Sequence, residues 1–221
     1  MIGYPKLETL YNRLPNFSVD TTVLRVPAWG NVKNWLVTEK IDGMNIRIGL
    51  HADGSVEYNG RTDNAQLPST LVAYLRVTFN EDVMRTVFKQ DEAGVWPEVV
   101  VFGEGYGPKI QNGHTYRPDV AVRIFDVSIG DWWLEWDDVV AIAERLGARV
   151  VPVLCQALDF PRLEGDLHDI AGISAVATGE SGGPIRQAEG IVARAYPMLL
   201  TRDGARCMYK LKMSDFRGGK R

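Results

Sequence analysis

Trp35-Leu-Val-Thr-Glu-Lys-Ile-Asp-Gly-Met-Asn-Ile-Arg-Ile-Gly49 is the stretch on which the interpretation of this chain depends. Apolar residues typical of strands lie on both sides of Lys40-Ile41-Asp42-Gly43. The pattern predicts that the lysine amine lies at the end of a strand, at one side of a sheet, where it can contact a phosphate. Four residues are weak evidence by themselves, so their value depends on the motifs that follow along the chain.

Length and composition describe an ordinary globular protein. A chain of 221 residues is long enough for one large domain or at most two small ones, and we expect a single domain over residues 1–221. Apolar residues make up 45% and charged residues 24%, and no apolar run is long enough to span a membrane. Cys155 and Cys207 are too few for a disulfide framework and lack metal-ligand spacing. No secretory signal begins the sequence, so we expect a cytoplasmic protein.

The net charge of −3 excludes a polycation that coats nucleic acid non-specifically. Binding to nucleic acid stays possible if the basic residues converge on one face. The basic tail at residues 217–221 is interpreted as a solvated chain end.

Hydrophobic spacing predicts more strands than helices. We expect strands at 35–50, 55–60, 99–102, 121–127, 132–134, 150–154, 190–195 and 206–212. We expect helices at 67–79, 81–90, 137–146 and 166–177. The turn Asp53-Gly54 is a strong hairpin signal, Pro152 suggests an edge strand, and residues 181–184 are expected to form a loop. Many neighbouring strands are therefore antiparallel, which favours an α+β fold of mostly antiparallel sheets with flanking helices.

Five further motifs follow the lysine motif in order, and each carries a chemically suitable side chain at a strand end. They are Gly60-Arg61-Thr62, Phe102-Gly-Glu104-Gly-Tyr-Gly107, Phe125-Asp126-Val127, Glu189-Gly-Ile-Val192 and Lys210-Leu-Lys212. Glu104 follows a buried strand and is flanked by glycines that allow a ligand to approach closely. Lys210 and Lys212 share one strand face because side chains alternate along a strand.

A lysine amine is a poor nucleophile while it is protonated, and its reference pKa is about 10.4. Neighbouring cations and partial burial lower that pKa. Lys210, Lys212 and Arg61 are the candidate neighbours, and they could also neutralise a triphosphate while Lys40 attacks it.

The order and spacing of these motifs resemble the covalent nucleotidyltransferase superfamily of ligases and mRNA-capping enzymes. Within it, the chain is most similar to the phage-type RNA ligases related to the trypanosome RNA-editing ligases. The resemblance runs from Tyr4 to Lys212 and implies an ATP-grasp-like adenylyltransferase fold. It implies an ATP-dependent RNA ligase that carries AMP on Lys40, requires Mg²⁺ or Mn²⁺, and seals 3′-hydroxyl to 5′-phosphate ends.

The resemblance also implies roles for individual residues. Glu104 would bind the ribose, Phe125 would stack on the adenine, and Glu39 would help to define the base pocket. Lys210 and Lys212 would contact the α-phosphate. Further implied roles belong to Glu189 and Glu104 as metal-associated acids and to Arg61 and Asn45 as contacts to phosphates or to the RNA 5′ end. Asp42 stands where close relatives carry Asp or His, which leaves its step, adenylylation or sealing, open.

The sequence ends nine residues after Lys212, whereas most ligases of this superfamily carry an OB or helical domain there. We therefore expect a minimal domain without that addition. An oligomer or a partner chain could supply the missing surface, and efficient sealing is in doubt without one.

Several alternatives stay open at this level. RNA ends are the expected partner, but a minimal DNA ligase or action on a nicked duplex fits the same motifs, whereas a capping guanylyltransferase fits less well. A catalytically idle end-binding or scaffold protein is the alternative of another class. Single residues also have simpler explanations: Arg61 could pair with Asp63 or Glu57, and Phe125 could be a core residue.

Overall fold

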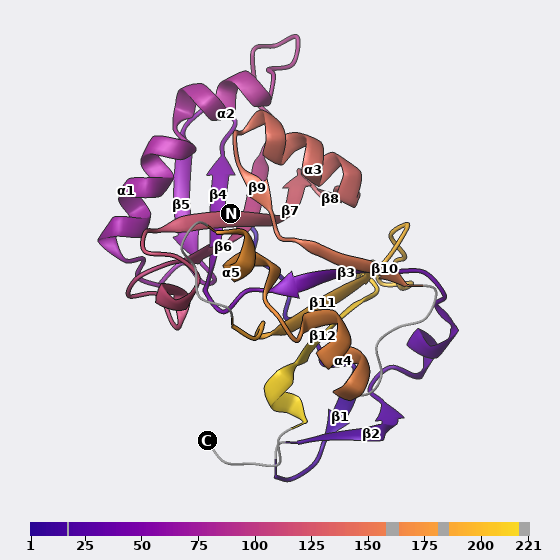
Figure 1. Ribbon diagram of the computed structural model, residues 1–221. Helices are drawn as coiled ribbons and strands as arrows, with labels where there is room; N and C mark the ends of the chain where they lie inside the picture. Colours follow the sequence, from indigo (N-terminus) through magenta and orange to yellow (C-terminus); the bar gives the residue numbers. More distant parts are fainter. Residues whose placement is uncertain (17, 158–163, 181–185, 217–221) are drawn as a thin grey trace. The chain divides into compact units, whose positions relative to one another are not determined.

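The computed structural model describes residues 1–16, 18–157, 164–180 and 186–216, and the expected loop at 181–184 and the tail at 217–221 lie outside them. The chain packs as two compact units, which we describe separately (Figure 1). Unit 1 contains Met1–Pro5 and Asp42–Val150, and unit 2 contains Lys6–Ile41 and Val151–Arg221. A single domain over the whole chain stays a prediction.

Unit 1 is built on a mostly antiparallel sheet in the order β5-β4-β6-β7-β8, with β9 pairing in parallel with β7. The strands are β4 (Met44–Leu50), β5 (Val56–Gly60), β6 (Val99–Tyr106), β7 (Ala121–Ile129), β8 (Trp132–Trp133) and β9 (Arg149–Val150). The long pairing of β4 with β6 carries the register on which the candidate site depends, because it sets Asn45 opposite Glu104.

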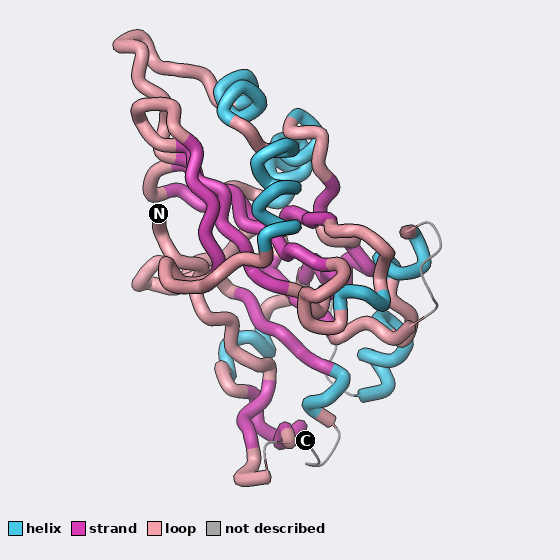
Figure 2. Tube along the Cα trace, turned by 90° about the vertical axis from the view of Figure 1, so that its left-hand side faces the viewer, coloured by secondary structure: helices cyan, strands magenta, loops and turns pink. Residues whose placement is uncertain are grey.

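The helices of unit 1 are α1 (Ser69–Thr78), α2 (Glu81–Val87) and α3 (Trp136–Arg145), with the single 3₁₀ turn η2 (Gly113–Thr115) in a loop. Each α-helix buries an apolar stripe, which in α1 includes Leu71 and Leu75 at 0% exposure. Asn80 caps α2 by accepting a hydrogen bond from the Val83 N–H. Figure 2 shows helices on one side of these strands and the N-terminus of the chain on the other.

The alternation of side chains along β4 explains why the helices lie on one face of the sheet and the N-terminal residues on the other. Ile46 and Ile48 are fully buried, and Leu71 of α1 lies close to Gly105 on β6, beside Ile46. Arg47 and Gly49 point to the opposite face, where the Met1 side chain lies against Gly49 and leaves no room for a Cβ there. The N-terminal residues therefore cover the face that does not carry the helices.

Unit 2 contains a four-stranded antiparallel sheet in the order β10-β3-β11-β12. Its strands are β3 (Trp35–Lys40), β10 (Val153–Ala157), β11 (Gly190–Ala195) and β12 (Met208–Lys212), and a separate hairpin joins β1 (Tyr11–Arg13) to β2 (Val19–Leu24). Helices α4 (Glu164–Ala171) and α5 (Ala175–Gly179) and the 3₁₀ turns η1 (Pro27–Asn31) and η3 (Met213–Asp215) complete it. Trp35, Val37, Ile191, Tyr209 and Leu211 form the middle of its core, all at 0% exposure.

The α+β class with mostly antiparallel sheets is confirmed, but several expected elements were wrong in extent. The strand expected at 99–102 continues to Tyr106, so Glu104 lies within β6 and does not follow it. The strand expected at 35–50 is broken at residues 41–43, and its halves lie in different sheets. Likewise, Pro152 separates β9 from β10, and Gly172 to Ser174 separate α4 from α5. The expected hairpin at Asp53-Gly54 is present, since β4 and β5 pair across it, and β10 is an edge strand as Pro152 suggested. Within the described residues, no helix is both long and apolar enough to cross a membrane.

Candidate functional site

In unit 2, Lys40 is the last residue of β3 and stands in a row that crosses three strands. Gly190 of β11 lies opposite Lys40 on one side and opposite Lys212 of β12 on the other. Residues directly opposite each other point to the same face of a sheet. Because Gly190 has no side chain, nothing in that row separates the two lysine side chains. Lys210 lies two residues before Lys212 and shares its face.

Glu189, immediately before β11, joins the two amines. Its Oε2 lies 2.6 Å from Lys40 Nζ and its Oε1 lies 2.5 Å from Lys212 Nζ. The side chains of Glu189 and Lys40 are 17% and 23% exposed, so the group is partly shielded from solvent. Burial alone would raise the pKa of Glu189, but the two ammonium groups together hold the pKa of this carboxyl below its ordinary value.

The sequence predicted cations around Lys40, and the structure shows that the Glu189 carboxylate also contacts its amine. The amine lies in an ammonium–carboxylate pair, and it must leave that pair before it can attack an electrophile. Lys212 reaches Lys40 through the same carboxylate, so the three side chains form one charged unit. The sequence prediction that these three residues act together therefore has a geometric basis within unit 2.

Glu39 points to the other face of β3, toward the core that Trp35 and Val37 also line. It is 1% exposed, and its two oxygens accept hydrogen bonds from Ser174 Oγ at 2.5 Å and from the Val176 N–H at 3.0 Å. Ser174 is the N-cap of α5, so Glu39 ties β3 to the start of that helix. Its expected role in a base pocket stays a prediction.

Gly190 gives a test of this strand packing. A Cβ at this position would fall on the Leu211 carbonyl oxygen and lie 2.7 Å from the Lys212 Cα, both backbone atoms that cannot move aside cheaply. We expect Gly190→Ala to lower the free energy of unfolding by about 3 kcal/mol, measured by urea denaturation.

The matched control is Gly165→Ala in α4, where a Cβ meets nothing within 4 Å. We expect this variant to keep or gain stability, by up to about 1 kcal/mol, because alanine favours a helix over glycine. Equal unfolding midpoints for the two variants would contradict the packing described here.

In unit 1, Glu104 of β6 and Asn45 of β4 are cross-strand neighbours and share one face of the sheet. Glu104 is half-buried, and its Cγ would lie 2.9 Å from a Cβ placed on Gly43. Gly43 is therefore required for the close approach of the turn after β3 to the Glu104 strand. Asn45 Oδ1 is buried and accepts no hydrogen bond in the described part of the chain, which leaves it able to accept one from a ligand.

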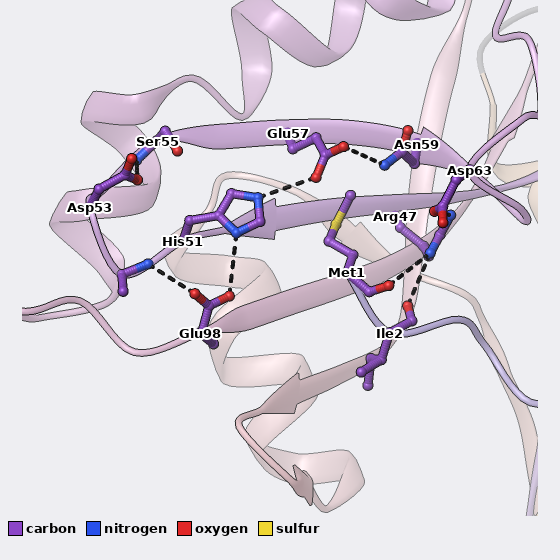
Figure 3. A network of polar contacts seen from close by, with 11 residues as sticks. Met1, Ile2, Arg47, His51, Asp53, Ser55, Glu57, Asn59, Asp63 and Glu98 are labelled. Atoms are coloured by element: carbon purple, nitrogen blue, oxygen red, sulfur yellow. Dashed lines mark hydrogen bonds and ion pairs between the residues drawn. The ribbon is translucent and has the colours of Figure 1, made fainter.

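Arg61 follows β5 and is exposed. The two acids that could have paired with it have other partners: Asp63 binds Arg47 at 2.7 Å, and Glu57 binds Asn59 and His51 (Figure 3). Among the described residues Arg61 makes no hydrogen bond or ion pair. Its guanidinium is thus available for an anion, as a phosphate contact requires.

Phe125 is half-buried in β7, where the ring of Tyr4 meets it edge-on at a centroid distance of 5.0 Å. Tyr4 is fixed in turn by its hydroxyl, which donates to Asp126 Oδ2 at 2.8 Å, and by contacts with Phe102 and Trp133. Phe125 therefore belongs to an aromatic cluster and still exposes part of its surface. Stacking on adenine stays a prediction.

The sequence argument missed Arg47, which is 2% exposed in β4. Its guanidinium donates to the carbonyls of Met1 and Ile2 and to the Asp63 carboxylate (Figure 3). It also donates to the Gly60 carbonyl. Arg47 thus holds both the N-terminal segment and the loop that presents Arg61. The alternation in Ile46-Arg47-Ile48 indicated a residue on the other face, but nothing in the sequence indicated that this face was covered.

A hydrated Mg²⁺ needs only one or two protein carboxylates. Glu189 is a partly buried carboxylate, but both of its oxygens are directed at ammonium groups, so its expected role as a metal ligand stays a prediction. Within the described ranges, no three His, Cys, Asp or Glu side chains come close enough together to hold a metal. Among those residues, an all-protein metal cage is therefore not present.

The family model described as "RNA ligase" matches residues 33–212. No curated protein sequence matches the chain. Among solved structures, an apo variant of a Naegleria gruberi RNA ligase superposes with a TM-score of 0.68 at 16% identity, over 97% of this chain and 57% of that one. A variant with ATP and Mn gives 0.66 at 15% identity, over 96% and 56%.

The same Naegleria ligase with PPi gives a TM-score of 0.64 at 17% identity, over 96% of this chain and 62% of that chain. The likeness supports the nucleotidyltransferase fold. This chain spans less than two thirds of the length of these matched chains.

Proposed function

Because this chain belongs to the RNA ligase family, we propose that it is an ATP-dependent RNA ligase that works through a lysyl-AMP intermediate. The observation that carries the proposal is the charged unit of Lys40, Glu189 and Lys212 at the end of β3. A nucleophilic amine beside a second cation and one carboxylate is suited to attack on a phosphate.

In the first step, the Lys40 ammonium releases a proton to solvent and the free Nζ attacks the α-phosphorus of ATP. A P–N bond forms, the bond to pyrophosphate breaks, and pyrophosphate leaves. Lys210 and Lys212 offset the negative charge of the phosphates during this exchange, since phosphoryl transfer depends mainly on positioning and charge neutralisation. AMP stays on Lys40 as a phosphoramidate.

In the later steps, AMP passes from Lys40 to the 5′-phosphate of an RNA, and the free amine is regenerated. The 3′-hydroxyl of the second end then attacks that phosphate, forms the phosphodiester and expels AMP. Arg61 and Asn45 bind the phosphates or the RNA 5′ end in this proposal. Within the described residues, Arg61 makes no hydrogen bond or ion pair, so its guanidinium suits a phosphate, and Asn45 Oδ1 is an acceptor without a partner that suits a hydroxyl of the RNA end.

The nucleotide itself is bound by residues that the family resemblance suggests. Glu104 holds the ribose, Phe125 stacks on the adenine, and Glu39 helps to define the base pocket. Glu189 and Glu104 are the candidate ligands for Mg²⁺ or Mn²⁺, which would supply charge neutralisation at the phosphates. Asp42 acts in adenylylation or in sealing. We further expect the protein to work in the cytoplasm.

Two labelled forms of ATP test the first step. With Mg²⁺ present, label in the α-phosphate is expected to remain on the polypeptide, whereas label in the γ-phosphate is expected to leave with pyrophosphate. A protein that retains neither label is not a nucleotidyltransferase, and the scaffold alternative then gains support.

Pre-adenylylated strands test the choice of nucleic acid. We expect sealing of pre-adenylylated RNA to exceed sealing of the matching DNA strand by about tenfold or more, the scale on which a buried contact to a 2′-hydroxyl discriminates. Nicked and single-stranded forms of each are compared in the same assay. Faster sealing of DNA would replace the RNA ligase proposal with a minimal DNA ligase.

A further inference from the structure

Asp42, two residues after Lys40, is held from two directions within unit 1. The Asn112 side-chain amide donates to Asp42 Oδ2 at 2.7 Å, and the Asp42 N–H donates to the Tyr116 hydroxyl at 2.9 Å. Both partners come from the loop that joins β6 to β7. One contact fixes the carboxylate and the other fixes the backbone.

The loop that carries both partners has an unusual backbone conformation. Lys109 and Gln111 have φ values of 65° and 48°, in a region that non-glycine residues adopt at a cost of about 1 kcal/mol or more each. Gly107 has φ 131°, and Gly113 lies so close to its backbone that a Cβ there would be 2.6 Å from the Gly107 oxygen. Such a conformation persists only where its surroundings enforce it.

Buried packing and backbone hydrogen bonds enforce it. The Ile110 N–H donates to the Gly107 carbonyl at 3.2 Å, and the Tyr116 N–H donates to the Gly113 carbonyl at 3.0 Å. Tyr116 is 0% exposed and meets Tyr106 of β6 edge-on at 5.6 Å. The hydroxyl that receives the Asp42 N–H is therefore carried on a fixed ring.

The turn is also held from its other side. A Cβ on Gly43 would fall on the Gly105 carbonyl oxygen and lie 3.3 Å from Glu104 Oε1. Asp42-Gly43 is thus confined between the Glu104 strand and the loop that carries Asn112. Only Ile41 separates Lys40 from Asp42 in the sequence.

We propose that Asn112 and Tyr116 are positioning residues that orient the Asp42 carboxylate and the backbone after Lys40 for the ligase reaction. The inference rests on the proposed function. Neither residue was assigned a site role from the sequence, because the thirteen residues 108–120 separate the Glu104 motif from β7 and contain only the short turn η2. Only the folded loop brings them to Asp42.

The test variant is Asn112→Asp, which places a second carboxylate where an amide now donates to Asp42. Two carboxylates this close cannot both be ionised without repulsion. Both self-adenylylation and the sealing of pre-adenylylated RNA are measured, because Asp42 acts in one of these steps. We expect the rate of that step to fall about tenfold at pH 8. We expect part of that loss to be regained at about pH 5, where two neighbouring carboxylates begin to share a proton that restores a hydrogen bond.

Three comparisons complete the experiment. The same rate is expected to fall about tenfold in Asn112→Ala at both pH values, since no proton can restore the lost hydrogen bond to Asp42. His114→Ala changes an exposed residue of the same loop that makes no hydrogen bond to Asp42 in the described part of the chain, and it is expected to match wild type at both. Tyr116 and Glu104, the other ionisable groups at this turn, are present in every variant and cannot cause the difference.

Wild-type rates for Asn112→Ala and Asn112→Asp, or an Asn112→Asp loss that is the same at both pH values, would overturn the inference. If wild type itself takes up no label, the proposed function fails instead. The contact of Asn112 with Asp42 is then judged by a double-mutant cycle of unfolding with Asp42→Ala and Asn112→Ala, where additive effects would refute it and a coupled effect would support it.

Discussion

Protein carrying Lys40→Ala is expected to take up no α-phosphate label from ATP. The variant has no amine with which to form the P–N bond, and covalent enzymes that lose their nucleophile slow by roughly 10⁶-fold. The change also removes one of the two lysines that pair with Glu189 and leaves the ion pair with Lys212, so a correctly folded variant must be shown first. Urea unfolding and gel filtration serve that purpose.

Lys40→Arg distinguishes the two roles of the Lys40 side chain, because arginine keeps the positive charge but provides no nucleophile. A guanidinium can still pair with Glu189, so the charged unit is expected to survive and the fold with it. Because a guanidinium stays protonated and cannot attack, labelling should be as low as in Lys40→Ala. The control is Lys89→Arg at an exposed position in unit 1, which should label like wild type. Label on Lys40→Arg would place the nucleophile elsewhere.

Lys40→Ala is also expected to keep one activity, the sealing of RNA that already carries AMP. Once AMP is already joined to the RNA, sealing no longer needs the Lys40 amine as an attacking group. We therefore expect Lys40→Ala to seal pre-adenylylated RNA within about tenfold of wild type. A loss of labelling alone would indicate a defect in the first chemical step, whereas an equal loss in every step would indicate a folding defect.

The β4–β5 hairpin and α3 could be predicted from sequence because local signals and tertiary packing agree there. Asp53-Gly54 favours the turn, and apolar residues at helical spacing follow Asp137 and Asp138. The continuous apolar run at 35–50 misled the prediction for a physical reason. Its strand propensity is uniform, and the break at 41–43 is set by Gly43 packing against Gly105, a contact distant in sequence.

For the site, the motif series identified Lys40, Glu189 and Lys212, which unit 2 brings into direct contact. Alternation correctly put Lys210 and Lys212 on one face. It did not identify Arg47, Asn112 or Tyr116, because their contacts run to carbonyls and to a turn that no local pattern specifies. The same reason explains why Ser174 was missed as the partner of Glu39.

Glu189 is the second residue whose loss is expected to have a large effect. Glu189→Gln keeps the shape of the side chain but removes the charge that lies between two ammonium groups. Lys40 and Lys212 would then face each other without compensation, and the candidate metal ligand would be weakened. We expect labelling to fall by about a hundredfold, the scale on which a single preorganised electrostatic contact acts in catalysis.

Asn45→Ala is the matched comparison, because Asn45 is expected to serve mainly the binding of the RNA 5′ end in a later step. Its labelling should fall less than that of Glu189→Gln, and its sealing of RNA should fall more than its labelling. Equal losses of labelling in the two variants would refute this division of roles.

Stability against pH gives an independent measurement on the same residue. The folded protein holds the pKa of Glu189 below its ordinary value of 4.5, so the ionised carboxylate stabilises the fold above that pH. This contribution is lost as the pH falls through the lowered value. We expect Glu189→Gln to be less stable than wild type by about 1–3 kcal/mol at pH 7, a partly exposed pair being worth less than a fully buried one. The difference between the two unfolding free energies should shrink below pH 4. A difference that stays constant down to pH 3 would mean that the ion pairs with Lys40 and Lys212 do not stabilise the fold.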